Sequence, residues 1–580
     1  MKSIKIKLIV EYLFYKKTNN LMHKICIFFF LVFSVLVSSG QKSGGKNDLG
    51  SPTCVVPSGR QVYMKVTSHY LNIPVGYHSK MKLVKLRMNG MLEREFPVQL
   101  AEDTIGYWIF IDVSEFKGQK ISLSCMAGQN ALNRIYQSDQ INGEDSLYKE
   151  SNRPQFHFTV KRGWSNDVNG PIYYNGQYHL FWQSFPYGLD WNTGFMNWGH
   201  AVSKDLIHWK ELDPALRPDS LGSPWSGTAV IDKNNDGGWG KNALVLYYAC
   251  YDQISGKQVQ CIAYSTDNGK TFKRYKGNPV IDSNWELGTN DTRDPKVFWY
   301  ESSKTWVMVL FEGDGMSFYN STDMKHWKRQ SHFKDLWECP DFFELPVDGD
   351  TSNQKWVLHG GSSDYYIGSF DGKTFNPETK KLNYAEGSSE TNGDFLYAAQ
   401  SFENMPNNRR VQLAWGRIAQ EGMPFTQMML FPTEFVLKTT NQGIRLLATP
   451  IKEIELLHED EHNWHNLSAQ QANQKLNEVE PGPLQINMKF RLDAGNKMEI
   501  RYQGNEILNL TSTDFPNGEN QMEILIDKTV AEIFINNGER YIIRKLLPKR
   551  NDNSLEFDSE KYGPFLESLI VFRLKSIWNQ

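Results

Sequence analysis

Short runs of alternating apolar and polar residues, separated by turn-forming residues, extend along most of the chain. In the N-terminal part they lie at residues 62–66, 82–88, 107–113 and 121–127. Alternation with a period of two is typical of half-buried β-strands, and several such strands at short spacing favour a β-sandwich. We therefore expect a small β-sandwich-like accessory domain over residues 50–150.

A second pattern repeats within residues 155–448. The sequence Ser-x-Asp, followed by an aromatic residue, recurs after successive strand-like apolar runs, with copies that begin at Ser203, Ser265, Ser321 and Ser369. Repeats that each supply about four strands are typical of a β-propeller. Together with a divergent copy after Asp394, the pattern predicts five blades. Strands that radiate from one axis would bring residues distant in sequence to a common funnel.

The C-terminal part alternates again. A short helical run at residues 451–458 predicts a linker over residues 449–465, and six alternating runs follow between residues 484 and 574. Residues 466–580 are therefore predicted to form a second β-sandwich. The expected fold class is all-β: a five-bladed β-propeller followed by a C-terminal β-sandwich, with an additional small N-terminal β domain. At 580 residues, the chain is long enough for several domains.

The first 40 residues predict export. A basic pair at residues 23–24 precedes an apolar run at residues 25–37, and small residues follow at 38–40. This order is typical of a secretory signal peptide, and the apolar run is short for a membrane span. We expect residues 1–40 to be a signal peptide with an upstream extension, the natural start lying near Met22. The protein is expected to be secreted or periplasmic; membrane attachment is not evident, and association with the cell surface stays open.

Composition and charge narrow the functional classes. A net charge of −3 argues against a nucleic-acid partner, which normally requires a basic patch. No Cys/His spacing resembles a zinc site and no glycine-rich loop resembles a phosphate cradle, so neither a metal, a nucleotide nor another cofactor is expected. Six cysteines are too few for a disulfide scaffold. Cys250 and Cys261 flank a predicted hairpin and are expected to face each other, as buried residues rather than as a disulfide.

Three acidic motifs within the repetitive region carry the candidate chemistry. Asp167 lies in Trp-Ser-Asn-Asp-Val-Asn-Gly, Asp294 in Arg-Asp-Pro and Glu338 in Glu-Cys-Pro. Hydrolysis of a glycosidic bond with retention requires one carboxylate as nucleophile and a second, protonated carboxyl as proton donor. Each motif alone is equally well explained by turn chemistry or a structural ion pair. Their occurrence together in one aromatic-rich region favours the catalytic interpretation.

The contexts of the three acids suggest different roles. The Asn- and Gly-rich turn around Asp167 can present a nucleophile, whereas apolar neighbours desolvate Glu338 and suit a group that must hold its proton until it donates it. Asp294, next to Arg293, can accept hydrogen bonds from sugar hydroxyl groups. Cys339 is interpreted as a packing neighbour, because no histidine partner is evident. The residues around them that we expect to bind sugar are Asn166, Gln183, Trp191, Trp225 and Ser226.

These motifs resemble those of glycoside hydrolase family 32, the invertases, inulinases and levanases that cleave β-fructofuranosyl bonds. Residues 164–170, 293–295 and 338–339 match the three acidic motifs of the family, and residues 524–534 resemble its sandwich signature. The resemblance implies a five-bladed propeller with a β-sandwich, a retaining double displacement without a cofactor, and a fructan or sucrose as substrate. The region before Gln155 lies outside the common family core.

The resemblance also implies a role for each matching residue. Asp167 would be the nucleophile, Glu338 the acid/base and Asp294 the stabiliser of the transition state. The fructose subsite would be lined by Asn166, Gln183, Trp191, Ser226, Arg293, Tyr397 and Trp415. This sequence departs from the family at Val168, which replaces the usual proline and leaves the turn less restrained. We interpret that departure as a change in specificity or loop structure rather than a loss of activity.

Three other functions stay open at this point: an arabinofuranosidase, a fructan-binding protein and a fructosyltransferase. An arabinofuranoside-active five-bladed glycosidase is disfavoured by the Glu-Cys pair and the C-terminal sandwich. A fructan-binding protein on an inactive scaffold would be favoured by the loss of any of the three acids, and all three are present. Fructosyl transfer shares the covalent intermediate of hydrolysis and differs in the attacking group. Endo and exo cleavage depend on loop height, which the sequence pattern does not predict.

Overall fold

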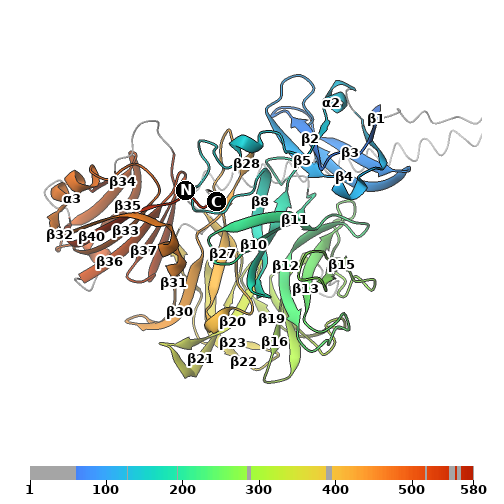
Figure 1. The fold of residues 1–580 in the computed structure, drawn as a ribbon. Coiled ribbons are helices and arrows are strands. Elements are labelled where there is room, and N and C mark those ends of the chain that lie inside the picture. The colour runs from blue at the N-terminus through green and yellow to red at the C-terminus, as the bar shows by residue number, and fades with distance from the viewer. Residues whose placement is uncertain are drawn as a thin grey trace, which may run out of the picture. The chain divides into compact units, whose positions relative to one another are not determined.

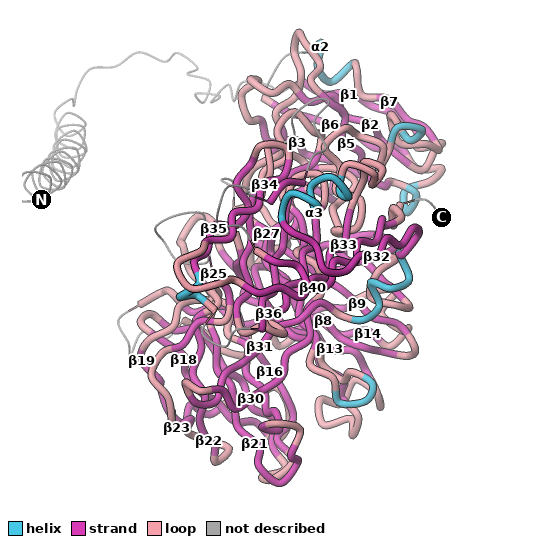
Figure 2. Tube along the Cα trace, turned by 90° about the vertical axis from the view of Figure 1, so that its left-hand side faces the viewer, coloured by secondary structure: helices cyan, strands magenta, loops and turns pink. Residues whose placement is uncertain are grey.

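The computed structural model describes residues 60–578 except for 127–128, 192–193, 284–288, 387–394, 516–518, 548–554 and 558–563. The expected signal peptide at residues 1–40 lies outside the described residues. The described chain consists mainly of antiparallel strands with a few short helices (Figures 1 and 2), so the expected all-β class is confirmed. Among the described helices, none has the length and apolar character needed to span a membrane.

The N-terminal part forms two small sheets around one core. Its elements are β1 (Arg60–Lys65), β2 (Tyr70–Val75), β3 (Lys82–Met88), β4 (Met91–Val98), β5 (Tyr107–Asp112), η1 (Ser114–Phe116), β6 (Lys120–Cys125), α2 (Gln129–Asn133), β7 (Tyr136–Ser138) and η2 (Glu144–Ser146). The sheets have the strand orders β1-β6-β3-β4 and β5-β2-β7. The four expected strands correspond to β1, β3, β5 and β6. Strand β2 escaped prediction because five of its six residues are buried without alternation.

As described, the middle part contains one five-stranded, two four-stranded and one ten-stranded sheet, in which most neighbouring strands are antiparallel. Its main strands are β8 (Gly163–Tyr174), β9 (Gln177–Phe185), β10 (Asn197–Ser203), β11 (Trp209–Leu216), β12 (Ser223–Asp232), β13 (Ala243–Tyr251), β14 (Gln258–Ser265), β15 (Lys273–Arg274), β16 (Thr292–Tyr300), β17 (Thr305–Glu312), β18 (Gly315–Ser321), β19 (Lys328–Lys334), β20 (Asp341–Val347), β21 (Asp350–His359), β22 (Asp364–Phe370), β23 (Phe375–Pro377), β26 (Leu396–Ser401), β27 (Val411–Gly416), β30 (Thr433–Thr440) and β31 (Gly443–Pro450). Shorter elements are β24 (Leu382–Asn383), β25 (Ala385–Glu386), η4 (Pro406–Asn408), β28 (Phe425–Thr426) and β29 (Met428–Met429).

The first strands of these sheets lie against one another. Strands β8–β11, β12–β15, β16–β19 and β20–β23 pair in chain order, and β26, β27, β30 and β31 pair in the same way. Strand β8 contacts both β12 and β26, β12 contacts β16, and β20 contacts β26. Because these first strands meet, side chains at their ends can converge although they are far apart in sequence.

The repeated Ser-x-Asp sequence has a local structural cause. It lies where the third strand of a sheet turns into the fourth. Asp205 accepts hydrogen bonds from the backbone N–H groups of Ile207 and His208, and Asp323 makes the same pair of contacts in its own sheet. The aromatic residue that follows lies at the start of the outer strand. The motif therefore forms an Asx-type turn between the third and the fourth strand of its sheet.

The C-terminal part forms a seven-stranded and a three-stranded sheet. Its elements are η5 (Lys452–Leu457), β32 (His458–Ser468), α3 (Ala469–Leu476), β33 (Leu484–Arg491), β34 (Lys497–Tyr502), β35 (Asn505–Thr511), η6 (Ser512–Asp514), β36 (Glu519–Ile526), β37 (Val530–Ile535), β38 (Arg540–Lys545), β39 (Leu555–Phe557) and β40 (Phe565–Leu574). The larger sheet has the order β25-β38-β37-β36-β33-β40-β32, and the smaller one β35-β34-β39. All six expected strands are present.

The expected linker over residues 449–465 needs correction. Its first half forms η5, as the helical run indicated, but its second half belongs to β32, which pairs with β40 along most of its length. Strand β32 lies at the edge of the sheet and none of its residues is fully buried. It therefore lacks the apolar alternation that would have identified it.

The expected pairing of Cys250 with Cys261 is also wrong in register. The strands pair Cys250 with Val259 and Tyr248 with Cys261, because the hairpin turns one residue earlier than Ser255-Gly256 indicated. Both cysteines are free, buried thiols in one apolar cluster. Their interpretation as buried residues is confirmed.

A buried histidine joins the middle part to the C-terminal sheet. The Nδ1 atom of His157 lies 2.9 Å from Asp527 Oδ2, and its Nε2 atom lies 2.6 Å from Glu532 Oε1. Asp527 also accepts backbone hydrogen bonds from Gln155 and Phe156. Burial lowers the pKa of His157, but the hydrogen bonds and negative charge of the two carboxylates more than offset this and raise the pKa to about 9.

This pKa predicts a pH-dependent contribution to stability. The folded-state pKa of about 9 exceeds the unfolded value of 6.5, so protonated His157 stabilises the fold fully below pH 6.5, and the stabilisation is lost as pH rises through 9. We expect the difference in melting temperature between the wild type and His157→Gln to be largest near pH 6 and to shrink towards pH 10. Thermal unfolding across this range measures it. A difference that stays constant with pH would contradict the assignment.

Candidate active site

One cavity collects the residues that the sequence singled out. It has a volume of about 390 Å³ and is lined by Asn166, Asp167, Gln183, Trp191, Gly194, Met196, Trp225, Ser226, Arg293, Asp294, Trp337, Glu338, Tyr397, Trp415 and Arg417. All eleven predicted catalytic and sugar-binding residues are among them. A larger cavity of about 960 Å³, lined among others by Glu344, Gln354 and Arg410, contains none of the predicted residues.

Interruptions in strand pairing occur at the predicted catalytic and sugar-binding residues. The regular register breaks in β8 between residues 165 and 168, in β12 between 224 and 227, in β16 between 293 and 296, and in β26 between 397 and 400. A bulge bends a strand and redirects the unpaired side chain. Asn166, Asp167, Ser226 and Asp294 all lie within these breaks. The same interruption of pairing thus recurs in the first strands of several sheets, and it directs their polar side chains into one cavity.

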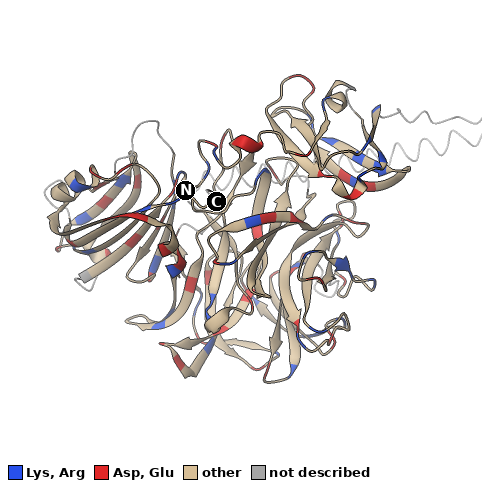
Figure 3. Cartoon of the chain, viewed as in Figure 1, with Lys and Arg blue, Asp and Glu red and all other residues tan. Residues whose placement is uncertain are grey.

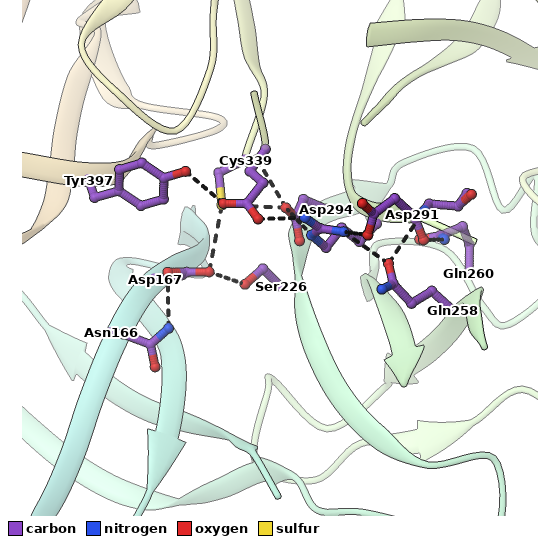
Figure 4. Close-up of polar contacts among 12 residues, drawn as sticks. Asn166, Asp167, Ser226, Gln258, Gln260, Asp291, Asp294, Cys339 and Tyr397 are labelled. Atoms are coloured by element: carbon purple, nitrogen blue, oxygen red, sulfur yellow. Dashed lines mark hydrogen bonds and ion pairs between the residues drawn. The ribbon is translucent and has the colours of Figure 1, made fainter. Parts of the chain in front are cut away.

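Ser226 and Asn166 hold Asp167 by hydrogen bonds (Figure 4). Its Oδ2 atom accepts a hydrogen bond of 2.7 Å from the Ser226 hydroxyl, and its Oδ1 atom accepts one of 3.0 Å from the Asn166 amide. Trp164 in turn donates to the Asn166 side-chain oxygen at 2.8 Å. Burial raises the pKa of Asp167, the charge of Glu338 adds to the rise, and the hydrogen bond from Ser226 opposes it. The result is a fixed, desolvated carboxyl group.

Glu338 is held from two sides. Its Oε1 atom lies 2.5 Å from the Arg293 guanidinium, and its Oε2 atom accepts a hydrogen bond of 2.6 Å from the Tyr397 hydroxyl. The backbone of Glu338 and Cys339 is left-handed, with φ of 51° and 41°. Such conformations cost free energy in non-glycine residues and persist only where the surroundings enforce them. The strained turn before β20 therefore fixes the position of the Glu338 carboxyl group.

Asp294 is the most deeply buried of the three acids, with 4% of its side chain exposed. Its Oδ2 atom accepts a hydrogen bond of 3.0 Å from the Cys339 backbone and lies 3.8 Å from the Arg293 guanidinium. Burial raises its pKa to about 7; Arg293 opposes the rise, while the charges of Glu338 and Asp167 add to it. Arg293 keeps its charge, because the acids raise its pKa despite burial.

Cys339 lies between two of the acids. Its sulfur atom is 3.6 Å from Asp167 Oδ2 and 3.6 Å from Asp294 Oδ2. Burial, together with the neighbouring negative charges, raises the pKa of its thiol, so the group stays protonated and donates weakly to the carboxylates. Within the described ranges, no group of His, Cys, Asp and Glu is arranged to hold a metal ion. Charged residues of both signs are mixed over the sheets, so the number of charges does not distinguish this site (Figure 3).

The walls of the cavity are aromatic. Trp225 stacks on Tyr251 with ring centroids 4.0 Å apart, and Trp415 donates a hydrogen bond of 3.1 Å to the Gln427 side chain. Gln183 is buried and donates to the Pro224 carbonyl at 3.2 Å. Trp191, by contrast, is 53% exposed and lies at the rim. Flat rings around a polar floor suit a sugar, whose C–H faces stack on aromatics while its hydroxyl groups form hydrogen bonds.

Four of the lining residues were not among those predicted to bind sugar. Trp337 is 50% exposed and packs edge-on against Phe311, and the Arg417 guanidinium lies over the rings of Tyr397 and Trp415. Gly194 and Met196 complete the set. Trp337 directly precedes Glu338, and Arg417 follows Trp415 by two residues. Both lie within two positions of a predicted residue, so a search of the neighbours of each predicted residue would have identified them.

Comparison with known proteins agrees with this geometry. Residues 157–450 match the description "Glycosyl hydrolases family 32 N-terminal domain". The levanase of Bacillus subtilis (strain 168) is 38% identical over 75% of this chain and 72% of its own length. The extracellular exo-inulinase of Aspergillus niger is 35% identical over 52% of this chain and 65% of its own length.

A solved structure supports the same assignment. The crystal structure of exo-inulinase from Aspergillus awamori superposes with a TM-score of 0.64, at 26% identity, over 74% of this chain and all of that one. The family match begins after the N-terminal sheets, at residue 157, and contains all three acids. The protein belongs to glycosyl hydrolase family 32 and is a glycoside hydrolase.

Proposed function

We propose that the protein is a β-fructosidase that hydrolyses β-fructofuranosyl linkages in fructans such as levan and inulin, or in sucrose. The observation that carries the proposal is the convergence of Asp167, Asp294 and Glu338 on one aromatic-walled cavity. The names of the related levanase and exo-inulinase support a fructan as substrate.

The first chemical step is the attack of Asp167 on the anomeric carbon. An Asp167 oxygen forms a bond to that carbon while the bond to the leaving oxygen breaks, and Glu338 gives its proton to the leaving oxygen. The Ser226 hydroxyl and the Asn166 amide hold the nucleophile in place without extra reorganisation. This step leaves a covalent fructosyl ester on Asp167 and an ionised Glu338.

The second step returns the enzyme to its starting state. Glu338 removes a proton from water, the water oxygen attacks the anomeric carbon, and the bond to Asp167 breaks. Arg293 and Tyr397 hold Glu338 and compensate its negative charge between the two steps. Asp294 accepts hydrogen bonds from the fructose hydroxyl groups, and Gln183, Trp191, Trp225 and Trp415 complete the subsite.

The arrangement of sheets supports a five-bladed propeller for this catalytic part. The five groups of four paired strands begin at β8, β12, β16, β20 and β26. Strand β8 contacts β12 and β26, β12 contacts β16, and β20 contacts β26, while Phe298 of β16 packs against Phe342 of β20. We infer that residues 155–448 form the propeller, residues 50–150 a sandwich-like accessory domain, and residues 466–580 the C-terminal sandwich, to which the preceding strand β32 also belongs. We further propose that residues 1–40 direct secretion or export to the periplasm.

Product analysis tests the proposed function. Purified mature protein is incubated with levan, inulin and sucrose, and the sugars released are separated by chromatography. Free fructose as the first product of a fructan would support the proposal with exo cleavage; a ladder of oligosaccharides would support it with endo cleavage. If no fructoside is cleaved while binding is retained, the proposal is wrong and a fructan-binding function replaces it. Cleavage of arabinofuranosides alone would equally overturn it.

A further inference from the structure

An unbroken apolar cluster joins the N-terminal sheets to the wall of the active site. It contains core residues of the N-terminal part together with Trp164, Phe185, Tyr187, Met196 and Trp415 of the catalytic part. Trp225 and Tyr397 pack against the same cluster. Five of these seven catalytic-part residues either line the cavity or lie within the Asp167 motif. The core of the N-terminal part therefore continues into the aromatic layer around the site.

The best-defined contact across this boundary is the stack of Phe96 on Tyr187. Their ring centroids lie 4.5 Å apart with planes inclined by 22°. Phe96 is fully buried in β4, and Tyr187 is buried two residues after the end of β9. Tyr187 packs edge-on against Phe185, and a Cβ atom added at Gly188 would lie 2.7 Å from the Phe185 ring. Residues 185–188 are thus tightly packed against one another, and Tyr187 joins them to the N-terminal sheets.

The same segment carries Trp191 to the rim of the cavity. Trp191 follows Tyr187 by four residues and is 53% exposed, so few of its own contacts fix its place. Asp190, next to it, lies close enough to Tyr107 of β5 to add to the rise in pKa that burial causes there. Further along the chain, Trp225 of β12 donates a hydrogen bond of 3.4 Å to the Gly194 carbonyl. The chain on either side of Trp191 therefore has contacts with the N-terminal sheets and with a strand of the catalytic part.

We propose that the N-terminal sheets are a positioning part of the active site: Phe96, through Tyr187, holds residues 185–191 and thereby places Trp191 at the sugar-binding rim. An exposed ring can stack on a sugar at little entropic cost only if its backbone is already ordered. Phe96 touches no substrate and acts through Tyr187, so its effect falls on binding. The role of Trp191 as a sugar platform rests on the proposed function; the ordering of residues 185–191 by Phe96 does not.

Two variants of the full-length mature protein test the proposal. Phe96→Ala removes the stack. Leu123→Ala is the control: it removes similar buried apolar contacts from β6, which lies in the same sheet but is separated from β4 by β3. We expect Phe96→Ala to raise KM for the cleaved fructoside about tenfold and to change kcat less than about twofold, as loss of ground-state positioning predicts. Phe96→Leu should restore part of the loss. Leu123→Ala should lower the melting temperature and leave both kinetic constants unchanged.

A second readout separates this proposal from the proposed function. Hydrogen–deuterium exchange of the peptide covering residues 186–191 should rise in Phe96→Ala and stay at the wild-type level in Leu123→Ala. If the wild type cleaves no fructoside but this exchange pattern is found, the positioning role stands and the proposed function fails. Equal exchange and equal KM in the two variants would overturn the positioning role. If Phe96→Ala does not fold, Tyr187→Leu removes the same stack from the catalytic side and is judged by the same outcomes.

Discussion

Replacement of Asp167 by asparagine is expected to lower kcat for fructoside hydrolysis by about 10⁴-fold or more, because it removes the only nucleophile that the mechanism provides. Asparagine has the same shape and can still accept the hydrogen bond that Ser226 now donates to Asp167 at 2.7 Å. The variant should therefore fold normally and keep its affinity for the substrate. Steady-state kinetics on the substrate identified by product analysis, together with the melting temperature, measure both effects.

Asp291→Asn is the matched control. Asp291 is also an acid bound to Arg293, and its side chain is 43% exposed, but it does not line the cavity. We expect its loss to lower kcat/KM less than about tenfold, because Arg293 keeps its contact with Glu338. If Asp167→Asn retained more than a hundredth of the wild-type kcat, or if both variants lost activity equally, Asp167 would not be the nucleophile.

The sequence predicted which residues form the site better than it predicted the contacts between them. Asp167, Asp294 and Glu338 are each flanked by turn-forming or proline residues, and such flanks mark places where a strand is interrupted. The pairing breaks at residues 165–168 and 293–296 are the physical form of that signal. What the motifs do not encode is which donors each acid meets. The contact of Tyr397 with Glu338, for example, joins residues 59 positions apart.

Some strands of the fold could likewise be predicted from the sequence and others could not. Runs that alternate, such as those that became β3 and β5, were identified because their more buried and less buried positions alternate. Strand β2 is buried on both faces and β32 is exposed along an edge, so neither alternates. Their assignment depends on neighbours contributed by distant parts of the chain. The role of the N-terminal sheets has the same origin, since the stack of Phe96 on Tyr187 exists only in the folded protein.

A buried ion cluster is formed by Lys296, Asp341 and Glu403, two of which follow the predicted catalytic acids Asp294 and Glu338 closely in sequence. The Lys296 ammonium group lies 2.8 Å from Asp341 Oδ1 and 2.7 Å from Glu403 Oε1, with the side chains of Lys296 and Asp341 at most 1% exposed. Asp341 also accepts hydrogen bonds of 2.7 and 2.6 Å from the backbone N–H and hydroxyl of Ser401. The acids raise the pKa of Lys296 despite its burial, and the lysine holds the pKa of Asp341 well below its usual range.

We expect Lys296→Met to destabilise the protein by about 3–5 kcal/mol, since the fully buried Asp341 carboxylate would lose its lysine partner; Glu403 is 20% exposed and keeps Arg410 at 3.7 Å. The matched control is Lys304→Met, which breaks an exposed ion pair with Glu301 and should cost less than about 1 kcal/mol. Melting temperatures of both variants measure the difference. The double variant Lys296→Met/Asp341→Leu should recover part of the loss, because an unpaired buried charge is removed with its partner. If Lys296→Met melted no lower than the control, the cluster would not stabilise the fold.

Lys296 follows Asp294 by two residues and Asp341 follows Glu338 by three, so the destabilised variant should also lose activity below its melting temperature.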